Sequence, residues 1–128
     1  MTIEKRSVIS AGLAAMALSA SLWTAPPAAA RMPFDGNWSV LIITDEGTCD
    51  RAYRYALHII NGKISYDDPS FNITGHADGR GNVSVSVSAG GQRASGSGQL
   101  SGDSGQGTWS GHSSTSQCSG HWQADRRG

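Results

Sequence analysis

Apolar and polar residues alternate with a period of two along the chain after its first thirty residues. From Asn37 to Thr44, Trp38 shares one face with two aliphatic residues, and from Ala52 to Ile60, Tyr53 and Tyr55 share one face. No segment in this part has the three-and-four spacing of an amphipathic helix. The pattern therefore predicts β-strands with one buried and one solvated face.

A tight hairpin is predicted at Asn61-Gly62, because this pair supplies the two positive-φ positions of a two-residue turn. Tyr66 then faces inward after the turn. A further strand begins at Phe71 and ends in the turn-rich segment 78–82.

The glycine- and serine-rich second half keeps the same period. Three valines alternate with serines from Asn82 to Ser88, and in 93–100, 107–111 and 120–124 one face is polar while the other consists of small residues interrupted by Trp109 and Trp122. Inward glycines leave room for a large ring across a sheet. The alternative is a disordered linker, but a linker gives no reason for tryptophans at regular inward positions, so we expect strands.

The pattern gives eight strands joined by short turns, which is typical of an antiparallel meander. In a meander, the loops that follow odd-numbered strands all lie at the same end of the sheet. Cys49 and Cys118 fall in the loops after the first and seventh strands, so both are expected at that end. If the last strand pairs with the first, the two cysteines come within bridging range. We therefore predict an all-β fold, an eight-stranded antiparallel meander closed into a small barrel; a two-sheet β-sandwich is the alternative.

Residues 1–30 have the three-part layout of a secretory signal peptide, expected to be helical: a basic start at Lys5-Arg6, an Ala-rich apolar run, and small residues up to Ala30. A transmembrane anchor is the alternative, but the run is short and only weakly apolar for a span. We expect cleavage to leave 31–128 as a single domain, secreted or periplasmic, with no membrane span.

Charge and cysteine content narrow the functional classes. The chain has ten basic and ten acidic residues, and removing Lys5, Arg6 and Glu4 leaves eight and nine, so no excess of positive charge favours nucleic acid as a partner. Paired thiols persist in an exported protein, and no CxxC or HxxxH pattern indicates a metal site. We predict a Cys49–Cys118 disulfide, no metal and no cofactor.

The loops at the cysteine end are longer and more varied than those at the other end, so a binding site is expected there. The carboxylates of this end would suit a hard cation, but exposed loops are commonly acidic without that purpose. No G-x-S-x-G elbow or phosphate-binding loop occurs. We therefore do not expect an enzyme.

The inward aromatic residues have two interpretations. Eight strands enclose a lumen just wide enough for side chains, so the rings would fill it. Alternatively, they line a pocket for a small hydrophobic ligand, and the glycines create its space. The candidate ligand-binding residues are Trp38, Tyr53, Tyr55, Trp109 and Trp122.

The segments FDGNWSV, CDRAYRY, NVSVSVS, GTWSG and CSGHW together resemble small, exported, β-rich and uncharacterised proteins of alphaproteobacteria, and this resemblance implies no particular activity. More distantly, the early Gly36-Asn37-Trp38 and the strand pattern are similar to the calycin superfamily of lipocalins, avidins and metalloprotease inhibitors. This second resemblance implies a binding barrel.

The expected function is a non-catalytic, exported binding module for an unknown small molecule, bound through the loops at the disulfide end. The alternative is a factor that binds an envelope protein, either a protease inhibitor or a surface adhesin. For an inhibitor, residues 31–35 would form a free arm able to enter an active-site cleft.

Overall fold

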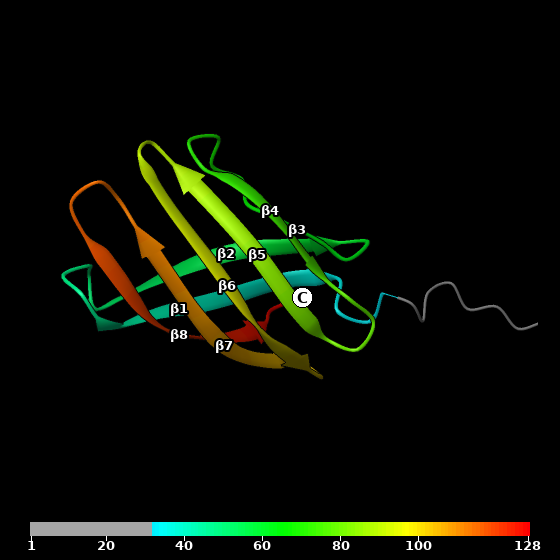
Figure 1. Cartoon of the computed structure of the whole chain (residues 1–128). Helices are drawn as coiled ribbons and strands as arrows, with labels where there is room; N and C mark the ends of the chain where they lie inside the picture. The colour runs from blue at the N-terminus through cyan, green and yellow to red at the C-terminus, as the bar shows by residue number, and fades with distance from the viewer. Residues whose placement is uncertain (1–31) are drawn as a thin grey trace, which may run out of the picture.

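A computed structural model describes residues 32–128, in which eight antiparallel strands close into a barrel (Figure 1). The strands are β1 (Gly36–Glu46), β2 (Ala52–Ile60), β3 (Lys63–Ser65), β4 (Asn72–Ala77), β5 (Asn82–Ala89), β6 (Gln92–Ser101), β7 (Ser104–His112) and β8 (Gln117–Arg126). The predicted meander barrel is confirmed, and the sandwich is wrong. The predicted signal peptide lies outside the described residues. Among residues 32–128, no helix is long and apolar enough to cross a membrane.

The barrel closes because β1 pairs with β2 on one side and with β8 on the other. Trp38 lies opposite Leu57 of β2, and Ile42 lies opposite Trp122 of β8. In Figure 1, β5, β6 and β7 cross in front of β1, β2 and β8. The pairing between β1 and β8 is regular up to Thr44 and then shifts at a β-bulge before Glu46.

The Asn61-Gly62 hairpin forms as predicted. Both residues have positive φ, 53° and 78°, which is the conformation of a two-residue turn that matches the twist of the strands. The Asp35 carboxylate accepts hydrogen bonds from the backbone N–H groups of Asn61 and Gly62, at 2.7 and 2.9 Å. An N-terminal residue thus holds a turn of the barrel in place.

The glycine- and serine-rich segment forms β5, β6 and β7, so the linker alternative is wrong. Its inward glycines accommodate rings across the sheet. The Trp122 ring covers Gly98 and Gly107, because a Cβ at Gly107 would lie 2.6 Å from the Trp122 ring. The indole N–H of Trp122 donates to the Ser97 carbonyl at 3.2 Å, so the buried ring keeps its polar atom satisfied.

Residues 32–35 are not the free arm that the sequence suggested. The Phe34 carbonyl accepts the indole N–H of Trp38 at 2.9 Å, and the Phe34 ring packs against the core. Arg126 donates to the carbonyls of Pro33 and Asp35 at 3.0 and 2.8 Å, and its guanidinium lies 4.9 Å from the Trp38 ring centroid. The segment therefore covers the tight-turn end of the barrel.

The predicted disulfide is present, and it joins Cys49 in the loop after β1 to Cys118. Its Cα–Cα distance is 6.2 Å, within the usual range for a bridge. The sequence had placed Cys118 in the loop before the last strand. In the structure it is instead the second residue of β8. The closing strand is thus linked directly to the loop that leaves β1.

Candidate ligand-binding cavity

The barrel lumen contains a cavity of about 290 Å³. Its lining runs from Trp38, Ile59 and Leu100 at the tight-turn end to Cys49, Ala89 and Ser116 at the cysteine end. This volume is at the small end of the range for ligand pockets.

The lumen has two halves that differ in burial. In the half near the tight turns, which we call the closed half, the inward side chains are buried, and Trp38, Leu100 and Trp122 are 2%, 4% and 6% exposed. In the half near the cysteines, the open half, the inward apolar side chains are only half-buried: Ile42, Tyr53, Tyr55, Ile73, Val85, Val87 and Trp109. Apolar side chains that face the lumen and still contact solvent indicate a hollow and not a packed core.

Four rings form one wall of the open half. Tyr55 meets Tyr53, Tyr66 and Phe71 edge to face, with centroid distances of 5.7, 5.5 and 6.3 Å. Tyr66 and Phe71 also meet edge to face at 5.4 Å. Burial raises the pKa of the Tyr55 phenol, and the nearby Tyr53, Tyr66 and Asp50 raise it further. The wall is therefore a largely apolar surface, and the Tyr55 hydroxyl within it holds its proton more tightly than a free phenol.

Beside these rings the sheet of the barrel is interrupted, because β3 is short. β3 pairs with β2 only from His58 to Ile60, and with β4 only at Lys63 and His76. Within the described part of the chain, residues 52–57 of β2 pair only with β1, and residues 72–75 of β4 pair only with β5. The edges of β2 and β4 that face each other are therefore unpaired over these residues. Segment 66–71, which contributes Tyr66 and Phe71, spans this interval and completes the lining.

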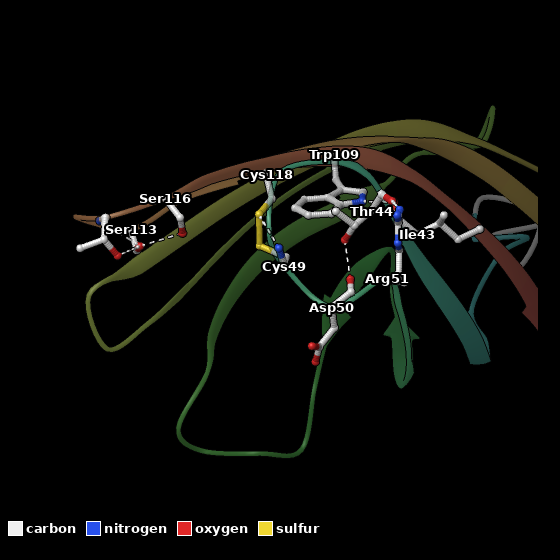
Figure 2. Close-up of a disulfide and its surroundings, with 10 residues drawn as sticks. Ile43, Thr44, Cys49, Asp50, Arg51, Trp109, Ser113, Ser116 and Cys118 are labelled. Atoms are coloured by element: carbon white, nitrogen blue, oxygen red, sulfur yellow. Dashed lines mark hydrogen bonds between the residues drawn. A yellow bond between two sulfur atoms is a disulfide. The ribbon is translucent and has the colours of Figure 1, made fainter.

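Trp109 of β7 forms another part of the lining of the open half. Its indole N–H donates to the Ile43 carbonyl at 3.0 Å, just before the β-bulge of β1 (Figure 2). Thr44 is 2% exposed and its hydroxyl donates to the Asp50 carbonyl at 2.7 Å, which ties the loop containing Cys49 to β1. Figure 2 shows the disulfide beside the Trp109 ring, so the bridge and this loop form one rim of the cavity.

The carboxylates of the cysteine end do not converge. Asp45 accepts a hydrogen bond from His121 at 2.7 Å, and Asp67 lies 2.9 Å from the His58 ring. Asp68 accepts hydrogen bonds from the hydroxyl and backbone N–H of Ser70, which lower the pKa of its carboxyl. Among residues 32–128 there is no group of three or more potential ligands arranged to hold a metal ion.

The five residues expected to bind a ligand all face the lumen but lie at different depths. Tyr53, Tyr55 and Trp109 line the open half, whereas Trp38 and Trp122 form the floor beneath it. Their role in binding stays a prediction.

Sequence reasoning left several lining residues out of the candidate set. Tyr66 and Phe71 fall on inward positions of the alternating pattern, like Tyr53 and Tyr55. The alternation alone could therefore have identified them as lining residues. Arg93 lies on the outward face of its strand by alternation, and no pattern in the sequence indicated that it borders the cavity.

Searches with protein-family models, with curated protein sequences and with solved structures found no significant match to this chain.

Proposed function

We propose that this protein is an exported, non-catalytic barrel that binds a small apolar ligand in the open half of its lumen. The observation that carries the proposal is the half-buried apolar lining of that half, beside a fully buried closed half. Covering such a surface with an apolar ligand is favourable by about 25 cal/mol per Å² removed from water.

Export is supported by two features. The Cys49–Cys118 bridge would persist only in an oxidising compartment. Residues 1–30 have the composition of a signal peptide. Mass spectrometry of the protein from its native envelope is expected to find an N-terminus at Arg31, and a retained basic segment would argue against export.

A role without catalysis is supported by the partners of two histidines, His58 and His121; His112 does border the cavity. The rings of His58 and His121 bond to Asp67 and Asp45 outside the cavity lining. The other ring nitrogen of His58 bonds to Asn37 at 2.7 Å, and not to a hydroxyl that could act as a nucleophile.

The test uses the neutral fluorophore N-phenylnaphthylamine, whose emission rises in an apolar site. We expect saturable binding by the oxidised protein, and loss of that binding in Ala94→Phe, where the added ring would occupy the open half. Ser97→Phe is the matched control, because Ser97 is on the same strand but exposed on the outer face. Absence of binding to the wild-type protein would overturn the proposal.

A further inference from the structure

Aromatic rings border the open half of the cavity from several elements. The ring cluster consists of Tyr53, Tyr55, Tyr66 and Phe71, on β2 and the segment after β3, and Trp109 borders the cavity from β7. Tyr55 stands at 88° to two of its neighbours in the cluster and at 73° to the third. Because the rings are nearly perpendicular, their faces turn in different directions, so the cluster forms a corner of the cavity and not a flat platform.

The chemistry of such a corner favours cations. The face of an aromatic ring carries partial negative charge and attracts a cation within about 6 Å of its centroid. The attraction is stronger where water is excluded, and the rings of the cluster are half-buried. Rings set at right angles around one space can contact a single cationic group from more than one direction. The ring cluster therefore suits a substituted ammonium group attached to an apolar body.

The connections at the cysteine end have an excess of carboxylates. The segments that join the strands there, 47–51, 66–71, 90–91 and 113–116, contain the carboxylates Asp50, Asp67 and Asp68 and one arginine, Arg51. The Arg51 guanidinium donates to the Thr44 carbonyl at 3.5 Å, on β1. An excess of negative charge around a cavity mouth attracts cationic ligands.

Asp50 is the carboxylate of these segments whose charge reaches the rings. Its carboxylate forms no hydrogen bond or ion pair with any residue in 32–128, whereas the other two carboxylates bond to neighbouring side chains. Figure 2 shows the backbone carbonyl of Asp50 bonded to Thr44, while the carboxylate points away from that contact. Burial and the neighbouring tyrosines raise the pKa of Tyr55, and the charge of Asp50 raises it further. An unpaired negative charge thus acts on the ring cluster.

The basic residues near the mouth belong to the outer face of the barrel. Arg93 borders the cavity, but the alternation of β6 places it on the exposed face with Ser95. Arg54 is exposed on β2, where it donates to the Ser39 hydroxyl at 3.0 Å. The alternation of β7 likewise places His112, which also borders the cavity, on the exposed face. The side chains that the strands turn into the open half are therefore uncharged.

We propose that the ligand is a small organic cation, a substituted ammonium, whose cationic group contacts the ring cluster and whose apolar body lies in the rest of the open half. This inference rests on the proposed function, because it names the ligand class of the same cavity. The ring faces and the charge of Asp50 then add affinity for the cation that a neutral ligand of the same shape does not gain.

The test compares phenyltrimethylammonium with tert-butylbenzene, a neutral molecule of the same shape, in titrations followed by the amide chemical shifts of the oxidised protein. We expect Asp50→Asn to weaken binding of the cation about threefold and to leave binding of tert-butylbenzene unchanged. Added salt should weaken binding of the cation to the wild-type protein. The matched control is Asp125→Asn, because Asp125 is exposed on β8 opposite Ser104, beside the tight-turn end; it should change neither affinity.

A second variant tests the rings. Tyr53→Leu keeps an apolar side chain but removes a ring, so it should weaken binding of the cation about fivefold and binding of tert-butylbenzene less than about twofold. Tyr53 suits this test because Tyr55 is its one ring contact among residues 32–128. The other edge-to-face pairs of the cluster therefore stay in place.

The outcomes separate the two proposals. If N-phenylnaphthylamine binds but phenyltrimethylammonium does not, the cationic ligand class is wrong while the apolar cavity stands. The same conclusion follows if the two variants leave binding of the cation unchanged, or weaken binding of the cation and of tert-butylbenzene equally. If neither N-phenylnaphthylamine nor either smaller ligand binds, the proposed function fails and the ligand class fails with it.

Discussion

The closed and open halves of the lumen are built from the same strands and the same period of two, yet the inward side chains are buried in the closed half and only half-buried in the open half. In the closed half, Trp122 covers Gly98 and Gly107, and residues 32–35 cover the end. In the open half, small residues face each other, as at Ala94 and Gly111 on β6 and β7. An inward glycine leaves space in the lumen. Whether that space is filled by a ring or stays empty depends on the side chain that faces it from the other side of the barrel.

The ends of the two halves are also held differently. The closed end is held by hydrogen bonds that the Asp35 carboxylate accepts and that the Arg126 guanidinium donates, whereas the open end is held by the Cys49–Cys118 bridge. A covalent link needs no packed side chains, so it can fix a rim while leaving space inside. The comparison assigns most of the packing stability to the closed half and, under the proposed function, ligand binding to the open half.

The largest expected effect separates the two halves directly. Trp122→Ala should lower the free energy of unfolding by about 3–5 kcal/mol, because it leaves a void in a buried core. Tyr53→Ala, in the open half, should lower it by about 1–2 kcal/mol, since that ring is already half-exposed. Urea denaturation measures both, and equal losses would contradict the division of the lumen.

Removal of the bridge in a Cys49→Ala, Cys118→Ala double variant should cost about 2–4 kcal/mol, because the link closes a loop with a sequence separation of 69 residues. Thermal unfolding of the oxidised wild type and the variant measures the loss. Hydrogen exchange should show the added opening near Cys49 and Cys118, with the amides of the closed half still protected. Opening that begins in the closed half would contradict the account.

Gly107→Ala should destabilise the protein by about 1–3 kcal/mol, because the new methyl group would collide with the Ser97 carbonyl and would lie 2.6 Å from the Trp122 ring. Gly91→Ala is the control: nothing lies within 4 Å of a Cβ at Gly91, and the change should be below about 0.5 kcal/mol. Calorimetry of the two variants tests this difference. A well-tolerated methyl group at Gly107 would contradict the close packing of this glycine against Ser97 and the Trp122 ring.

Asp35→Ala should cost about 1 kcal/mol, since it removes the acceptor of the N–H groups of Asn61 and Gly62. Chemical denaturation measures the cost, and proteolysis should then release the segment 32–35 earlier than in the wild type. Unchanged stability would show that this segment does not hold the closed end.

The smallest effect is on pH dependence. Burial raises the pKa of Tyr55 above its ordinary value of 10.0, so the folded state holds this proton more tightly than the unfolded state. Its contribution is fully present below the unfolded pKa and is lost as pH rises through the folded pKa. Titration of tyrosinate absorbance should lose a high-pH component in Tyr55→Phe, and a bound ligand should move that component higher. A component unaffected by the substitution would contradict the assignment.

Much of the fold could be predicted because the face on which a strand residue lies is set by its position in the alternating pattern, which is read from neighbouring residues. The alternation of valine with serine fixed the faces of β5, and the positions of Cys49 and Cys118 made barrel closure testable from the sequence. The covering role of residues 32–35 could not be predicted, because it depends on Arg126, which is 93 positions from Pro33.

The hollow could not be predicted either. Parity places Trp109 and Trp122 inside, but the direction of each ring along the lumen depends on its acceptor, the Ile43 carbonyl beside a β-bulge or the Ser97 carbonyl. The sequence left a filled lumen and a ligand pocket as alternatives, and the structure has a buried half and a half-buried half beside a cavity.

The most direct measurement of this division is a map of amide chemical-shift changes as N-phenylnaphthylamine is added to the oxidised protein. The account predicts the largest changes in the open half, at Tyr53, Tyr55, Val87 and Trp109, and small changes at Ala77, which is buried in the closed half and is not part of the cavity lining. Changes centred on the closed half or on the outer serine face would contradict it.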